Sequence, residues 1–572
     1  MMRCFGKLMK RPPPFWEETF TVPVSAELTQ SVQLICGKVI KGFKPADGAV
    51  TFRGVPFAIA KRAMPPEDVP SWDGEKDCTQ YGPACFQDPV GMRVIFEGLS
   101  QFFKESLFPP LPSSQSYCYG SFSEFDCLNL NVWTPALDGA KRPVIFWIHG
   151  GKFKMGSNIE AGLYDGQSLA KRTDVVVISA NYRVGAFSLH SVEHGETNLA
   201  LQDIICALRW VQDNVRVLGG DPDNVCIAGE SAGGIAVCNL LSSPAAKGLF
   251  HKAYTSSGGP FALHETNLRS VNEAAAKALG VQNVNRETLQ KLSVETLISS
   301  TKAIDESLEK ITAQVAFGPF RDGRIVPKEG PLRRAVEGHT KEVPLLIGYN
   351  RDEERIVNLL VGNWVASKML AKKEAAIPHL RMCRSLYEVD DAPNEKLQEQ
   401  VDRLWDATAR HLAEITGKKP TPGDIGGALM TLLDFAVPNY DLAAAHSASG
   451  GVTFMYRFDE PSPKVHGACH GLDLWFLWNL LESKWASYYC DHSGVLPGAA
   501  KNQALLKLAH DWQNALATFA RHGSPSSVTG AQWEPFPKML CVRAEGSKCV
   551  DAGLPLVRLL RPETTEPTST RV

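Results

Sequence analysis

The chain has 572 residues, of which 44% are hydrophobic and 21% are charged, so it holds enough apolar material for a large core. Its 60 Lys and Arg residues nearly balance 62 Asp and Glu residues, which gives a net charge of −2. This balance provides no general attraction to nucleic acid or to an anionic membrane. We therefore expect a folded protein that does not bind nucleic acid.

The N-terminal segment does not have the pattern of a secretory signal. Residues 1–20 carry Lys7, Lys10 and Arg11, but no apolar stretch precedes Pro12. The sequence contains no Asn-x-Ser/Thr acceptor and no apolar run of the ~18 residues that a spanning helix needs. These features predict a cytoplasmic location without a transmembrane segment, with secretion as the alternative.

Short β-branched runs alternate with helical stretches along the middle of the chain. Residues 198–215 carry apolar side chains at three- and four-residue spacing, as an amphipathic helix does, and residues 231–241 form another helix candidate. This order predicts an α/β fold in which a mostly parallel sheet has helices on both faces. The expected buried strands are 143–148, 174–179, 224–228, 343–348 and 452–458.

No internal repeat or linker divides the chain, which favours one large domain. We expect this domain to span residues 26–560, after an N-terminal extension of residues 1–25. Residues 80–125 are rich in Pro and aromatic residues, as a surface insertion is. The polar residues 561–572 predict a disordered tail.

Ser231 lies at the centre of a Gly-x-Ser-x-Gly pattern, between an expected strand and an expected helix. A serine on a sharp strand-to-helix turn presents its hydroxyl above the edge of the sheet. The backbone N–H groups that follow, at the helix N-terminus, can face developing negative charge. A nucleophilic serine is the functional interpretation, and a glycine-rich turn with a capping serine is the structural alternative.

His149, Gly150 and Gly151 come directly after the strand 143–148. Two glycines at a strand end allow backbone N–H donors to approach a tetrahedral oxyanion closely. A tight turn is the structural alternative. The segment precedes the serine turn, with another strand and helix between them, which is the order that a nucleophilic hydrolase needs.

A serine nucleophile requires a base, and the base requires an acid that orients it. Among the 14 histidines, His470 stands out because it follows an expected strand in a turn-like stretch. A lone histidine in a loop is more often a surface residue. The acid candidates are Asp352, Glu353 and Glu354, and composition does not choose among them.

Several segments of the chain, in order, resemble the type-B carboxylesterase/lipase family, which contains carboxylesterases and cholinesterases. The most specific of them, residues 198–234, includes the serine turn. The resemblance implies the α/β-hydrolase fold, with a mostly parallel central sheet and large insertions. It is carried by residues 52–58, 126–132, 149–151, 181–185, 198–234, 317–323, 350–353 and the turn at His470.

The resemblance also implies roles for individual residues. It implies Ser231 as the nucleophile, His470 as the base and Glu353 as the acid of a serine carboxylesterase. Such an enzyme hydrolyses small-molecule carboxylic esters through an acyl-enzyme and uses neither a metal nor a cofactor. The implied oxyanion hole and supporting residues are Gly150, Gly151, Lys152, Ala232, Glu230 and Ser257.

Two charged residues stand where the family usually has glycine, namely Lys152 and Glu354. Lys152 keeps a backbone N–H, so the oxyanion hole need not be lost, but its backbone is less free than that of glycine. Together with Lys154 it places two cations beside the expected oxyanion hole. This arrangement predicts a preference for acyl groups that carry an anion.

Family members commonly form a disulfide between the positions of Cys85 and Cys127, and the resemblance implies that bond here. In a cytosolic chain both thiols would be reduced instead. The 14 cysteines show no close pairs at zinc-finger spacing, so no zinc site is expected. Tyr117 and Tyr119 lie near the second loop cysteine without a Trp, so recognition of choline is not expected.

Two alternatives to a carboxylesterase are open. The first is a non-catalytic cholinesterase-like adhesion or binding protein of the same fold. Such relatives usually lack the nucleophile or the base, whereas Ser231, Glu353 and His470 are all chemically competent. The second is a hydrolase of thioesters, lactones or amides, because the three residues do not distinguish these substrates from esters.

Overall fold

The structure is a computed structural model that describes residues 29–88, 115–116, 120–190, 196–312, 316–361, 363–387, 392–483, 486, 490–491 and 494–552. The expected N-terminal extension and tail lie outside these residues, and so do Tyr117, Tyr119 and much of the stretch 80–125. The expectations about them therefore stay predictions.

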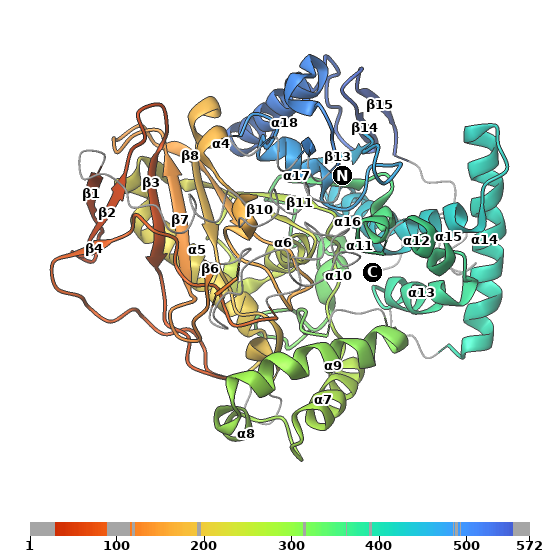
Figure 1. The fold of residues 1–572 in the computed structure, drawn as a ribbon, viewed down its shortest axis with the longest axis horizontal. Coiled ribbons are helices and arrows are strands. Elements are labelled where there is room, and N and C mark those ends of the chain that lie inside the picture. Colours follow the sequence, from red (N-terminus) through yellow and green to blue (C-terminus); the bar gives the residue numbers. More distant parts are fainter. Residues whose placement is uncertain are drawn as a thin grey trace, which may run out of the picture.

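A 13-stranded sheet forms the centre of the molecule (Figure 1). Its middle is parallel and runs in the order β9, β8, β10, β11, β12, β13 and β14, while antiparallel strands flank it on both sides. This confirms a mostly parallel central sheet. The strands are β1 (Thr29–Gln33), β2 (Val39–Phe43), β3 (Val50–Pro56), β4 (Glu75–Asp77), β7 (Asn129–Thr134), β8 (Arg142–Ile148), β9 (Val176–Ala180), β10 (Gly220–Glu230), β11 (Lys252–Ser256), β12 (Leu345–Asn350), β13 (Thr453–Phe458), β14 (Lys538–Val542) and β15 (Lys548–Asp551). A separate pair consists of β5 (Gln115–Ser116) and β6 (Gly120–Ser121).

All five strands expected from the sequence belong to the parallel part of the sheet, as β8, β9, β10, β12 and β13. Their ends differ from the expected ones by a few residues, as at β9, which begins at Val176. Every residue of β8 and β9 is buried, which explains why these strands read as continuous apolar runs.

Helices cover both faces of the sheet. Successive side chains of a strand point to opposite faces, so neighbouring residues of one strand pack against different helices. In β8, Phe146 belongs to the same buried cluster as Leu208 of α5. Trp147 belongs to the cluster on the other face, with Trp512 of α18. The α-helices are α4 (Gln167–Thr173), α5 (Leu199–Asn214), α6 (Ala232–Ser242), α7 (Glu265–Leu279), α8 (Arg286–Lys291), α9 (Val294–Thr312), α10 (Gly330–Val336), α11 (Ile356–Val361), α12 (Asn363–Leu370), α13 (Ala376–Arg384), α14 (Asn394–Thr416), α15 (Pro422–Thr431), α16 (Val437–Ala448), α17 (Leu472–Leu477) and α18 (Gln503–His522).

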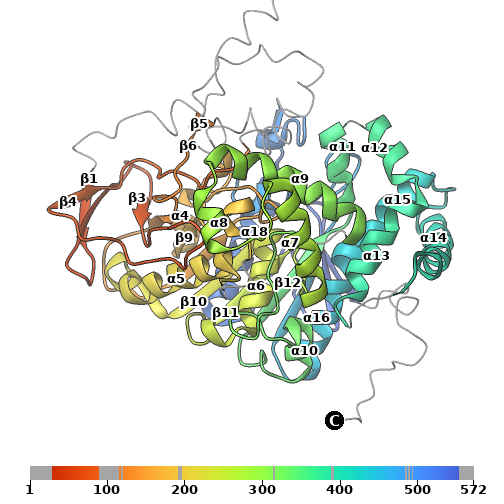
Figure 2. The same cartoon turned by 90° about the horizontal axis from the view of Figure 1, so that it is seen from below.

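Two large helical insertions extend from the carboxyl ends of neighbouring strands. Helices α7 to α10 lie between β11 and β12, and helices α11 to α16 lie between β12 and β13. Figure 1 shows α7 to α9 below the sheet and α12 to α15 at its right-hand end, and Figure 2 shows α11 and α12 together at one edge. The insertions confirm the expected elaboration of the fold. Across the described ranges, no helix is long and apolar enough to cross a membrane.

Candidate active site

Ser231 occupies a sharp turn between β10 and α6, as the sequence predicts. Its backbone has φ 57° and ψ −122°, which is unusual for a residue with a side chain. The Ser231 N–H donates to the carbonyl of Ser256 at 2.9 Å, and its carbonyl accepts from Ile235 N at 2.9 Å. A Cβ on Gly229 would lie 2.5 Å from the Gly233 carbonyl oxygen, so the tight turn requires glycine there.

The glycine segment after β8 lies against this turn, because β8 and β10 are neighbours in the sheet. A Cβ on Gly150 would come within 2.9 Å of Glu230 Oε2 and 3.1 Å of Ser231 Cβ. Gly151 has φ 108°, a conformation that favours glycine. The structure thus brings Gly150 and Gly151 together with Ser231 and with Ala232, the first residue of α6.

The two lysines beside these glycines have different environments. The Lys152 side chain is exposed, and its backbone has φ 55°. Lys154 forms an ion pair with Asp305 of α9, and both side chains are largely buried. Asp305 already balances the charge of Lys154, so the structure gives no support for an attraction of anionic acyl groups by Lys154. The expected preference stays a prediction.

Lys152→Gly is expected to stabilise the fold by about 0.5–1 kcal/mol, because an L-residue in the left-handed region is strained by roughly that amount and glycine is not. The measurement is the free energy of unfolding in urea. Lys141 is a matched reference, since it is also exposed and has φ 54°. Stabilisation by Lys141→Gly together with destabilisation by Lys152→Gly would contradict the assignment of strain to Lys152.

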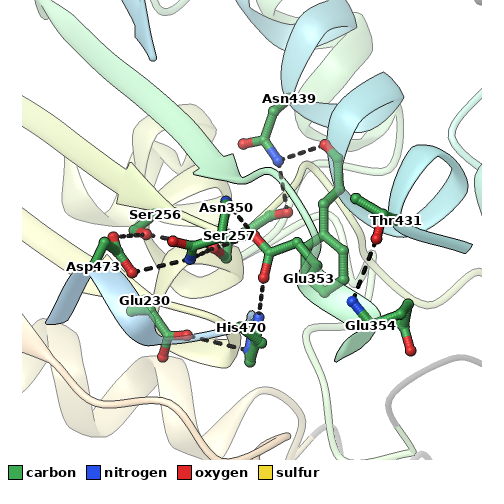
Figure 3. Close-up of polar contacts among 12 residues, drawn as sticks. Glu230, Ser256, Ser257, Asn350, Glu353, Glu354, Thr431, Asn439, His470 and Asp473 are labelled. Atoms are coloured by element: carbon green, nitrogen blue, oxygen red, sulfur yellow. Dashed lines mark hydrogen bonds and ion pairs between the residues drawn. The ribbon is translucent and has the colours of Figure 1, made fainter. Parts of the chain in front are cut away.

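Glu353 and His470 are paired in the structure (Figure 3). His470 Nδ1 lies 2.7 Å from Glu353 Oε2. The backbone N–H of His470 donates to the backbone carbonyl of Glu353 at 3.1 Å. The other carboxylate oxygen, Oε1, accepts from Ser257 Oγ at 2.5 Å and from Asn350 N at 2.6 Å. These bonds fix the fully buried carboxylate against the imidazole.

The two acidic neighbours of Glu353 point elsewhere. Asp352 Oδ2 accepts from Ala468 N at 2.9 Å and forms an ion pair with Arg351, so it braces the loop before His470. Glu354 donates its backbone N–H to Thr431 Oγ1 at 3.3 Å and lies on the far side of Glu353 (Figure 3). Of the three candidates, only Glu353 contacts the imidazole.

The second nitrogen of His470 lies beside another carboxylate. Nε2 is 3.1 Å from Glu230 Oε1, and within the described residues no hydrogen bond joins Ser231 Oγ to His470. Burial lowers the pKa of His470, but the charges of Glu230 and Glu353 outweigh it and raise that pKa to about 10. The imidazole therefore lies between the carboxylates of Glu353 and Glu230. Glu230 directly precedes the candidate nucleophile, Ser231, in the sequence.

A polar network beneath this pair includes residues that sequence reasoning missed. The buried Asp473 accepts from Ser256 Oγ at 2.7 Å, from Asn350 Nδ2 at 3.0 Å and from Tyr456 OH at 3.3 Å. Burial raises the pKa of Asp473. The only sequence signal for it is its position three residues after His470, at the start of α17.

Cys85 and Cys127 are free thiols in the structure, so the disulfide that the resemblance implies is not formed. Both side chains are buried, and a hydrogen bond with Cys85, together with burial, raises the pKa of Cys127. Two buried thiols joined by a hydrogen bond thus occupy the place of the expected bond. The cytoplasmic location, which would explain reduced thiols, stays a prediction.

Comparison with known proteins identifies the family to which this chain is related. Residues 28–549 match the carboxylesterase family. The chain is 31% identical to para-nitrobenzyl esterase of Bacillus subtilis (strain 168), over 84% of this chain and 88% of that protein. It is 31% identical to carboxylesterase 1D of Mus musculus, over 88% and 87% of the two chains.

Solved structures show the same relationship. A thermophilic pNB esterase matches with a TM-score of 0.73 at 27% identity, over 93% of this chain and all 100% of that one. A carboxylesterase of Geobacillus stearothermophilus matches with a TM-score of 0.71 at 28% identity, over 93% and 99% of the two chains. The fold is thus the α/β-hydrolase fold, and the protein is a carboxylic ester hydrolase rather than a non-catalytic binding protein. The chain belongs to the carboxylesterase family.

Proposed function

We propose that this hydrolase cleaves carboxylic esters through an acyl-enzyme on Ser231, with His470 as the base and Glu353 as the orienting acid. The observation that carries the proposal is the 2.7 Å contact between His470 Nδ1 and Glu353 Oε2. It leaves Nε2 beside Glu230, the residue that precedes Ser231. To act as the base, the imidazole has to lose its proton and exchange Glu230 for Ser231 Oγ.

In the first half of the reaction, His470 Nε2 takes the proton of Ser231 Oγ while that oxygen attacks the ester carbonyl. The tetrahedral intermediate then collapses, and the imidazolium gives its proton to the leaving alcohol. Water attacks the resulting acyl-enzyme by the same steps and releases the acid. Glu353 holds the proton of Nδ1 and stabilises the imidazolium throughout.

The backbone N–H groups of Gly151, Lys152 and Ala232 would bind the oxyanion of each tetrahedral intermediate. Support for this comes from the close approach of Gly150 to Ser231 and from the position of Ala232 at the N-terminus of α6. Each such donor is worth about 2.7–4 kcal/mol of transition-state stabilisation.

Glu230→Gln is expected to shift the rising limb of the pH profile of kcat/KM to lower pH by about one unit. The base must be neutral to accept the serine proton, so activity rises as pH passes the pKa of His470. Removing the carboxylate 3.1 Å from Nε2 lowers that pKa and lets the base form appear at lower pH.

The measurement is kcat/KM for a neutral ester across neutral and alkaline pH. Glu337→Gln is the matched control, because Glu337 also lies near a histidine, His339, at 3.6 Å but on the surface. A limb that stays in place, or moves to higher pH, in Glu230→Gln would show that Glu230 does not act on the base.

A further inference from the structure

Four charged side chains adjoin the candidate triad without taking part in the proposed reaction. The charged cluster consists of Lys152, Glu354, His379 and Asp434. Its members come from four separate segments: the loop after β8, the turn after β12, helix α13 and a π-helical turn at Leu432–Ala436.

Three of the four segments also carry a residue of the candidate site or a residue in contact with it. Glu354 directly follows Glu353, and Lys152 directly follows Gly151. Asp434 precedes Phe435, whose ring centroid lies 5.1 Å from that of His470. The π-helical turn that holds Asp434 is a rare form that often occurs at functional sites. Phe435 thus places the π-helical turn against His470, and Glu354 lies close enough for its charge to raise the pKa of His470.

His379 and Asp434 form the centre of the cluster. His379 Nδ1 lies 2.6 Å from Asp434 Oδ2. Burial lowers the pKa of His379, but the charge of Asp434 outweighs it and raises that pKa to about 9, so the imidazolium is already paired. The Asp434 side chain is buried, with the residue only 9% exposed. Its other oxygen, Oδ1, accepts no hydrogen bond within the described residues. A buried acceptor without a donor is costly, and an N–H donor placed beside it would remove that cost.

Glu354 adds a second carboxylate with unused acceptor capacity. None of the described residues donates a hydrogen bond to its half-buried carboxylate, whereas its backbone N–H is bonded to Thr431. Burial and the charge of Asp434 raise the pKa of Glu354 to about 7, in spite of the opposing charges of His379 and Lys152. The two carboxylates repel one another, and a donor cation between them would relieve that repulsion.

We propose that the charged cluster binds a primary amine of the substrate, so that the enzyme acts on esters whose acyl or alcohol part carries an ammonium group. This inference rests on the proposed function. An ammonium group supplies N–H donors to Asp434 Oδ1 and to the Glu354 carboxylate. An anionic group supplies no N–H donor to Asp434 Oδ1, and an apolar chain would also leave that atom without a partner.

The test compares esters that differ only in one terminal group. On the acyl side, the methyl ester of an ω-amino acid is compared with the methyl ester of a fatty acid of the same number of heavy atoms. On the alcohol side, an ω-aminoalkyl butyrate is compared with the alkyl butyrate of equal length. We expect the ratio of kcat/KM, amine over neutral, to reach about 10 or more for one of the two sides, as for a hydrogen bond to a charged group.

Two variants connect this ratio to the cluster. Asp434→Asn and Glu354→Gln are each expected to lower the ratio about tenfold, since each removes a charged acceptor but keeps the side-chain shape. Either variant tests the proposal if the other fails to fold. Glu482→Gln is the matched control, because Glu482 also lies 2.7 Å from a histidine, His510, away from the site.

Three results would overturn the inference. They are equal rates for amine and neutral esters on both sides, a preference for esters that end in a carboxylate, and equal rates for the primary amine and its trimethylated form, which has no N–H. If no ester is hydrolysed, the proposed function fails as well. Hydrolysis of neutral esters without any preference for amines leaves the proposed function intact and removes only the amine site.

Discussion

Replacing Ser231 with alanine is expected to lower kcat for a short p-nitrophenyl ester by about 10⁶-fold, the loss typical when a serine hydrolase loses its nucleophile. The Ser231 side chain donates and accepts no hydrogen bond within the described part of the chain, and alanine retains the same backbone strain at φ 57°. The free energy of unfolding is therefore expected to change by less than about 0.5 kcal/mol. Hydrolysis rates and urea unfolding of the same preparation separate the two effects.

The matched control is Ser307→Ala, which removes the hydroxyl of an exposed serine on α9. Ser307→Ala is expected to keep full activity. A fluorophosphonate probe should label the wild-type protein at Ser231 and should not label Ser231→Ala. Unchanged activity of Ser231→Ala, or labelling at another serine, would contradict the proposed nucleophile.

Glu353→Gln is expected to lower kcat by about 10⁴-fold without unfolding the protein. In wild type, Oε1 accepts two hydrogen bonds, from Ser257 Oγ and Asn350 N, so the amide oxygen of glutamine is held at that position. The amide NH₂ then faces His470 Nδ1 and donates to it. His470 must carry its proton on Nε2, the nitrogen that has to accept the proton of Ser231.

Asp352→Asn provides the decisive comparison for Glu353→Gln, because Asp352 is the adjacent carboxylate and contacts Ala468 N instead of the imidazole. We expect a much smaller loss of kcat for Asp352→Asn than for Glu353→Gln. A larger loss of kcat for Asp352→Asn than for Glu353→Gln would show that Glu353 is not the acid. Glu374→Gln, at an exposed position, controls for the loss of a charge.

The parallel sheet and the serine turn could be predicted because their signals are local. The run PVIFWI in β8 is buried throughout, and the glycines around Ser231 fit a turn that tolerates no Cβ at Gly229. The resemblance to the family identified Glu353 and His470 as a pair. Their 2.7 Å contact agrees with that interpretation.

Contacts between distant segments could not be predicted. Composition did not choose among Asp352, Glu353 and Glu354. The choice depends on which carboxylate faces the loop of His470, and His470 lies 117 residues after Glu353 in the sequence. The pairing of Lys154 with Asp305 depends on how α9 packs, and nothing near Lys154 in the sequence indicates it. The contact between His379 and Asp434 likewise follows from the packing of two insertion helices.

Asp473 joins three strands beneath the candidate active site. Through Ser256, Asn350 and Tyr456 it ties together the carboxyl ends of β11 and β12 and the middle of β13, just where α17 begins. These hydrogen bonds fix the polar network beneath Glu353 and His470 to the sheet, whereas Lys152, His379 and Asp434 belong to a loop and to inserted helices. Substitutions in that loop and those helices can therefore change the charges around the candidate triad while the hydrogen bonds of Asp473 stay in place.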